Sequence, residues 1–204
     1  MPLPPPAAPA QSDPRTAVTA VEQATRLIAE GKRADALKVL DTALKAAPRN
    51  PQLRFLYGVI LAEDGKRRDA IDVFRQLIED YPELPEPYNN LAVMLAAEGD
   101  LDGARAALEN AVRALPGYAL AQENLGDVYL RLAARAYEQA TKLDARNASA
   151  SGKLKLTREL VDRLAPRAPA AGAASPSNAP PPAAGAASTS NAAPAAAPTS
   201  SPRN

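Results

Sequence analysis

Residues 85–118, PEPYNNLAVMLAAEGDLDGARAALENAVRALPGY, decide the fold because their pattern recurs along the chain. The two preceding stretches, residues 17–50 and 51–84, keep the same order of glycine, alanine, large apolar residue and proline. Four columns recur at intervals of 34 residues: Gly31, Gly65 and Gly99; Ala36, Ala70 and Ala104; Leu40, Phe74 and Leu108; Pro48, Pro82 and Pro116. Four columns in one register predict a tandem array of one structural unit.

Each unit predicts two amphipathic helices joined by a short turn. Apolar residues with a helical period precede the glycine, and the alanine and large apolar positions after it fall on one helix face. Glycine suits a helix end that needs a left-handed residue, and proline ends the second helix. Asn50 and Pro51 have the form of an N-cap and a first helical residue, and Pro85 and Pro87 offer the same start one unit later. The pattern therefore predicts an all-α fold.

The unit resembles the tetratricopeptide repeat, a helical hairpin of 34 residues. Matching motif positions in the second and third units are Gly58, Gly65, Ala70, Phe74, Pro82, Tyr88, Leu91, Ala92, Gly99, Ala104, Leu108, Ala111 and Pro116. The first unit is degenerate in its opening helix, where Ala20, Gln23 and Ala24 occupy the bulky, leucine and glycine positions. The resemblance covers residues 17–147 and implies a right-handed α-α superhelix of stacked hairpins. Around residues 123–127 and 133–137 the chain is similar to short proteobacterial members.

A fourth unit, residues 119–147, lacks the turn that the other units have. Its beginning and end are recognisable, but it is five residues shorter, and no glycine or proline occurs from Asp127 to Ser151. The sequence favours one continuous helix over about 119–146, and a hairpin with a very tight turn is the alternative. A final helix at about 153–165 carries Leu156, Leu160 and Leu164 on one side, as expected of a helix that caps the array.

The two ends differ in composition from residues 16–165, which are expected to form the repeat domain. Residues 1–15 hold six prolines, and residues 166–204 hold nine prolines, fifteen alanines and no acid. Such segments have little apolar surface to bury, so both tails are predicted to be disordered. No apolar run approaches the roughly 18 residues of a membrane span. As written, the chain is expected in the cytoplasm, or in the periplasm if a signal peptide lies upstream of Met1.

Reactive side chains are scarce, which argues against an enzyme. The 204 residues have a net charge of +1, with no Cys and no His, and residues 17–147 also lack Ser. The usual general base, thiol nucleophile and metal ligands are therefore missing, and neither a metal nor a cofactor is expected. The carboxylates of Asp100 and Asp102 are interpreted as helix caps and solvated charge. The basic run Lys66-Arg67-Arg68 lies between acids without an aromatic neighbour, so nucleic acid is not an expected partner.

The resemblance implies that the first helix of each unit lines a concave groove that binds a peptide or a partner helix. The groove positions are Phe55, Val59 and Ala62; Asn89, Val93 and Ala96; Glu123, Asp127 and Leu130, with Val21, Thr25 and Ile28 from the first unit. This strip is apolar at one end and acidic at the other, which favours a protein or peptide with basic and apolar side chains. Phe55 is expected either to anchor that ligand or to pack with Val59 against the neighbouring helix.

A groove for a terminal carboxylate, the chaperone-binding subtype, is improbable here. Its positions correspond to Val21, Thr25, Leu56, Glu86 and Asn90, of which only the asparagine suits that chemistry. The expected function is therefore a non-enzymatic scaffold for protein interactions. A structural or self-associating module and a regulatory subunit of a bacterial envelope complex are the alternatives.

Overall fold

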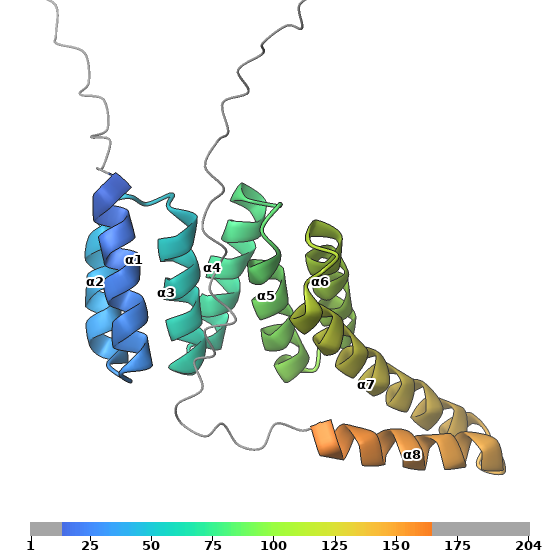
Figure 1. Ribbon diagram of the computed structural model, residues 1–204. Helices are drawn as coiled ribbons and strands as arrows, with labels where there is room; N and C mark the ends of the chain where they lie inside the picture. The colour runs from blue at the N-terminus through green and yellow to red at the C-terminus, as the bar shows by residue number, and fades with distance from the viewer. Residues whose placement is uncertain (1–13, 165–204) are drawn as a thin grey trace, which may run out of the picture.

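The computed structural model describes residues 14–164, and within that range the chain forms helices and no strand. The helices are α1 (Pro14–Ala29), α2 (Arg33–Ala46), α3 (Pro51–Glu63), α4 (Arg67–Asp80), α5 (Pro85–Glu98), α6 (Leu101–Ala114), α7 (Ala119–Leu143) and α8 (Ala148–Leu164). Hairpins α1–α2, α3–α4 and α5–α6 stack side by side, while α7 leaves the stack and α8 returns beneath it (Figure 1). Among these helices none is long and apolar enough to cross a membrane. Both tails predicted to be disordered lie outside the described residues.

The turn inside each of the three hairpins depends on one glycine. Gly31, Gly65 and Gly99 have φ angles of 73°, 77° and 86°, in the left-handed region that side chains with a Cβ disfavour. The next residue then donates back into the helix, as the amide of Lys32 does to the carbonyl of Leu27 at 2.8 Å. The same closing bond recurs after the other two glycines. The predicted left-handed helix ends are therefore confirmed.

Helix starts follow the predicted signals. The Asn50 side chain accepts a hydrogen bond from the amide of Leu53 at 3.0 Å, with Pro51 as the first residue of α3. Asp100 caps α6 in the same way through the amide of Gly103 at 2.9 Å. This contact confirms the interpretation of Asp100 as a helix cap. Proline at 85 begins α5, as the sequence predicts.

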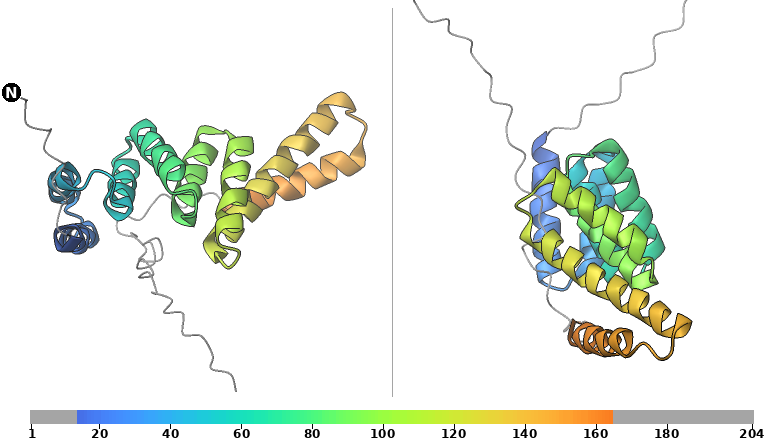
Figure 2. Two further views of the ribbon diagram at one scale, coloured as in Figure 1. Left: turned by 90° about the horizontal axis from the view of Figure 1, so that it is seen from above. Right: turned by 90° about the vertical axis from the view of Figure 1, so that its right-hand side faces the viewer.

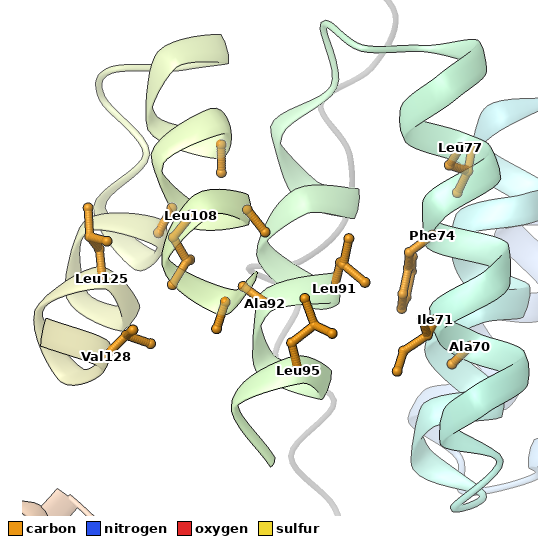
Figure 3. Close-up of a cluster of buried hydrophobic side chains, with 14 of the residues drawn as sticks. Ala70, Ile71, Phe74, Leu77, Leu91, Ala92, Leu95, Leu108, Leu125 and Val128 are labelled. Carbon is orange, nitrogen blue, oxygen red and sulfur yellow. The ribbon is translucent and has the colours of Figure 1, made fainter. Parts of the chain in front are cut away.

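Apolar side chains of adjacent helices form the core, which α3 divides into two clusters. Leu53, Leu56 and Ile60 join the first hairpin, while Phe55 and Leu61 join the cluster that runs on to α7. In the second cluster, α4 faces α5, and α6 faces α7 (Figure 3). Burying each large side chain contributes about 1.5–3 kcal/mol, so the array is stabilised mainly by contacts between neighbours.

α7 is one continuous helix from Ala119 to Leu143, as the lack of glycine and proline favours. Its fully buried residues, Ala121, Leu125 and Val128, all lie in the first three turns and pack on the array. The rest of α7 projects beyond α5 and α6 and pairs with α8 (Figures 1 and 2). The fourth unit therefore forms one long helix in place of a hairpin. The outer part of this helix pairs with α8, which follows the unit.

α8 differs from the prediction in its start and its orientation. It begins at Ala148, about five residues earlier than expected, because Asn147 caps it through the amide of Ala150 at 2.9 Å. The predicted leucine side does not pack against the array. The three leucines are exposed to 62%, 48% and 39%, in the order Leu156, Leu160 and Leu164.

A different side of α8 is turned inward. Its less exposed residues are Ala150, Leu154, Thr157 and Val161. This rotation is accompanied by two contacts with α7: Lys153 lies 5.7 Å from the centre of the Tyr137 ring, and Arg158 pairs with Glu138 at 3.3 Å. α8 therefore covers α7 while leaving Leu156 and Leu160 exposed.

Two helical glycines at equivalent positions test the packing. A Cβ at Gly58 would lie 2.8 Å from the buried Phe74 ring, whereas a Cβ at Gly126 meets nothing within 4 Å. Gly126→Ala should raise the free energy of unfolding by about 1 kcal/mol through helix propensity. Gly58→Ala should instead lower it by about 1 kcal/mol, because overpacking costs roughly 2 kcal/mol against the same gain. Urea unfolding measures the free energy of unfolding of both variants. Equal changes in the two variants would contradict the contact between position 58 and Phe74.

Candidate binding groove

The nine predicted groove residues separate into buried and accessible ones. Phe55 is 3% exposed and packs on Phe74, with ring centres 6.0 Å apart at 53°. Of the two interpretations of Phe55, packing against the neighbouring helix is the one observed. Asn89 is 1% exposed, and its Oδ1 accepts a hydrogen bond from Nδ2 of Asn124 at 2.8 Å. Both residues therefore connect elements of the array and present little surface to a ligand.

The other predicted residues keep accessible surface. Val59, Ala62, Ala96, Asp127 and Leu130 are half-buried. Val93 and Glu123 are exposed, and Val93 retains 43% of its surface although it is apolar. In the first unit, Val21 and Ile28 are half-buried and Thr25 is exposed.

Three of the predicted residues meet in one hollow between α5, α7 and α8. Val93, Ala96 and Asp127 line this hollow, which has a volume of about 480 Å³. Its remaining lining residues are Ala92, Ala97, Leu108, Asn124, Val128, Arg131 and Leu164. Glu123 and Leu130 lie on the same helix as Asp127 but do not line it, and the residues of α3 are separate from it.

The hollow has an apolar floor and one polar wall. Alanines and Val93 of α5 form the floor, and Leu164 at the end of α8 faces it. Asn124, Asp127 and Arg131 stand at successive turns of α7 and form the wall. Nε of Arg131 is buried and has no hydrogen-bond partner among the described residues. The hollow can therefore bury small apolar groups while offering an amide, a carboxylate and a guanidinium.

Sequence reasoning missed Asn124, Arg131 and Leu164. The first two lie one turn either side of Asp127 on α7 and could have been found by extending the polar stripe. Leu164 comes 33 residues after Arg131 in the sequence and reaches the hollow only because α8 turns back. No local signal carries that information.

Another polar feature lies near the junction of α5 and α7. Oε2 of Glu86 and the hydroxyl of Tyr118 are buried without hydrogen-bond partners among the described residues. Glu86 is 5% exposed, and this burial raises the pKa of its carboxyl above the usual value. Burial, with a smaller effect of the Glu86 charge, raises the pKa of Tyr118 to about 12. Ionised Glu86 is therefore less favourable in the fold than in the unfolded chain.

The side chains of the hollow suit binding better than chemistry. Among its lining residues there is no hydroxyl, thiol or amine that could act as a nucleophile. Within residues 14–164, no three potential metal ligands gather in one place. What the lining supplies is apolar area and hydrogen-bonding groups.

Family comparison agrees with this geometry. The tetratricopeptide repeat family matches residues 21–85, 62–119 and 89–132, which together span more than half of the chain. The chain therefore belongs to the tetratricopeptide repeat family. A comparison with curated proteins found no match.

Solved structures share the fold at low sequence identity. The first tetratricopeptide domain of Spaghetti (RPAP3), bound to the HSP90 peptide SRMEEVD, is 18% identical with a TM-score of 0.56, over 61% of this chain and 98% of that one. The Sgt2 domain from Aspergillus fumigatus is 16% identical with a TM-score of 0.57, over 67% and 88%. PcrH from Pseudomonas aeruginosa is 18% identical with a TM-score of 0.54, over 57% and 94%. At these identities the likeness concerns the fold alone.

Replacing Glu86 tests the buried carboxyl. Glu86→Gln should raise the free energy of unfolding near neutral pH by about 1–2 kcal/mol, because it removes a buried, unsatisfied charge. The folded state binds the Glu86 proton more tightly than the unfolded state, so the unsubstituted protein gains stability as the pH falls through the raised pKa. The advantage of the variant should therefore shrink towards about pH 4.

Urea unfolding at the two pH values measures this difference. The matched control is Glu123→Gln, an identical change at an exposed position of α7. Its effect should be small at both pH values. If Glu86→Gln were still more stable than the unsubstituted protein by the same free energy at the acidic pH, the charge of Glu86 would not be the cause of the difference.

Proposed function

We propose that this protein is a non-enzymatic interaction scaffold that binds a peptide or a partner helix along its concave groove, with the hollow between α5, α7 and α8 as the main contact. The observation that carries the proposal is the exposure of Val93 and Leu164 in one hollow beside the polar wall of α7. Apolar side chains left accessible in a concave site are typical of a binding surface.

The ligand is proposed to carry basic and apolar side chains. Asp127 lines the hollow, and Glu123 is exposed one turn before it on the same helix. Asn124 can hydrogen-bond to a ligand backbone whatever its sequence. Arg131 adds a donor on the same wall, which a backbone carbonyl of the ligand would satisfy.

One solved neighbour supports peptide binding as a class of function, and its peptide differs in charge from the ligand proposed here. The RPAP3 domain was solved with SRMEEVD, a peptide that contains three acids. Asp127 in the hollow and the exposed Glu123 one turn before it favour the opposite charge, so the ligand proposed here differs from that peptide.

Self-association is a second candidate, favoured by the exposed leucines of α8. A second copy could cover Leu156 and Leu160, which lie on the same helix as Leu164. Light scattering tests this candidate, because a self-associating module gains mass as its concentration rises.

Val93→Arg tests the proposed site. Peptides selected from a random library on the purified chain should be rich in Lys, Arg and apolar residues. Their affinity should fall at least about tenfold in the variant, because a bulky charge fills an apolar floor, a loss of about 1.4 kcal/mol or more. Isothermal titration measures the affinity, and circular dichroism checks that helicity is kept.

Leu115→Arg is the matched control for this change. Leu115 is apolar and 44% exposed, almost the same as Val93, but it follows α6 and does not line the hollow. Peptide affinity should be unchanged in this variant. Two results would contradict the assignment of the hollow as the binding site. One is an equal loss of peptide affinity in Val93→Arg and Leu115→Arg. The other is a set of selected peptides that bind Val93→Arg as tightly as they bind the unsubstituted protein.

A further inference from the structure

The pair formed by α8 and the outer half of α7 buries less than the hairpins of the array do. It projects from the stack, with α8 packed along α7 (Figures 1 and 2). From Tyr129 to Leu164, Ala150 is the only fully buried residue, whereas in the α3–α4 hairpin even Phe74 is 0% exposed. Helices in proteins are stabilised mostly by packing of an apolar face, so this pair is expected to have a further neighbour.

The exposed side of α8 is apolar along its middle and leaves room for that neighbour. Leu156 and Leu160 are one turn apart and are 62% and 48% exposed. Gly152 lies one turn before Leu156, and no atom comes within 4 Å of the place that a Cβ would take there. A glycine inside a helix costs stability, and no close contact within the described residues requires this one. The three positions form a strip with a depression at Gly152 that a leucine of another helix would fill.

Charges along one edge of this strip form a self-complementary pattern. Lys155 and Glu159 are exposed, lie one turn apart, and have no ion pair among residues 14–164. Lys153 and Arg158, by contrast, contact α7. An unpaired acid and an unpaired base on the same edge suit a second copy of the chain, because a two-fold interface brings the same surface of both molecules together.

We infer that two copies of this chain associate through α8, with the two helices antiparallel about a two-fold axis near residue 157. In this arrangement the same edge of both helices meets, so Lys155 of each copy pairs with the partner's Glu159. Leu156 and Leu160 of the two copies interdigitate, and the partner's Leu160 enters the depression at Gly152.

The orientation and the register follow from the same residues. A parallel pair would place the charged edge against the opposite edge of the partner helix, which offers Thr157 and a base, Lys153, but no acid. An antiparallel axis one turn later, between Glu159 and Arg163, would also pair charges but would require Leu164, which lines the hollow. The axis near residue 157 leaves Leu164 in place, so dimerisation and ligand binding are compatible.

The inference rests on the self-association candidate of the proposed function, and it uses a surface separate from the hollow. Neither Leu156 nor Leu160 lines the hollow. Two leucines and one ion pair from each copy make a small interface, of the kind that associates weakly and reversibly. The dimer should therefore depend on protein concentration.

Sedimentation equilibrium of the full chain tests the inference. The mass should rise from that of a monomer towards that of a dimer over about a hundredfold range of concentration. Leu160→Glu should raise the dimer dissociation constant at least about tenfold, because it places a charge in the centre of the apolar contact. Leu115→Glu is the matched control, since Leu115 is 44% exposed but follows α6, and its dissociation constant should not change. Circular dichroism checks that both variants stay helical.

Reversing the charges tests the antiparallel pairing. Lys155→Glu and Glu159→Lys should each weaken the dimer about fivefold, because like charges then meet twice across the axis. The chain that carries both changes restores opposite charges and should recover the dissociation constant of the unsubstituted protein. A loss caused by damage to the helix would not be recovered in this way.

Three results would overturn the inference. A mass that stays monomeric over the whole range would show that no second copy covers α8. Dimers that tolerate Leu160→Glu would place the contact on another surface. Single charge variants whose loss is not recovered in the double variant would contradict the antiparallel pairing. Peptide affinity should be the same in Leu160→Glu as in the unsubstituted protein, so loss of the dimer and failure of the hollow are measured separately.

Discussion

The glycine reversal at the end of each first helix is the constraint on which the rest of the structure depends. A right-handed helix that stops and turns back within two or three residues commonly uses one residue with a positive φ, and Gly31, Gly65 and Gly99 fill that position here. These reversals bring each second helix onto the first at the spacing that the buried alanines allow. Ala36, Ala70 and Ala104 have no exposed surface at these contacts.

The fourth unit shows what happens where that reversal is absent. Without a glycine, α7 runs on to Leu143 and turns back only after Asp144, so α8 pairs with its outer half. The return of α8 carries Leu164 to α5 and makes the hollow with Val93 and Asp127. The five missing residues therefore leave the fourth unit without its hairpin turn and make α7 one wall of this hollow.

Much of this arrangement could be predicted because it is encoded locally. The repeat register, the glycine turns, the Asn50 cap and the long α7 all depend on residues close together in the sequence. The role of Phe55 could not be decided, because a groove position and a core position both favour an aromatic residue. Its 3% exposure results from contact with Phe74, which the sequence does not specify.

The orientation of α8 was not predictable for a related reason. Its sequence offers two apolar stripes, and the leucine stripe is the larger. Contacts with Tyr137 and Glu138 accompany the rotation that turns the smaller stripe inward. The start of α8 could have been found, since Asn147 is a good cap.

The most direct test of the account is the distance between α5 and the end of α8. Because the chain has no native cysteine, spin labels can be placed at the exposed positions 97 and 163 through Ala97→Cys and Arg163→Cys. Pulsed electron spin resonance should give a short, narrow distance distribution, comparable in width to that of labels at positions 97 and 106 within the α5–α6 hairpin. A broad or long distribution would contradict the return of α8 and, with it, the hollow.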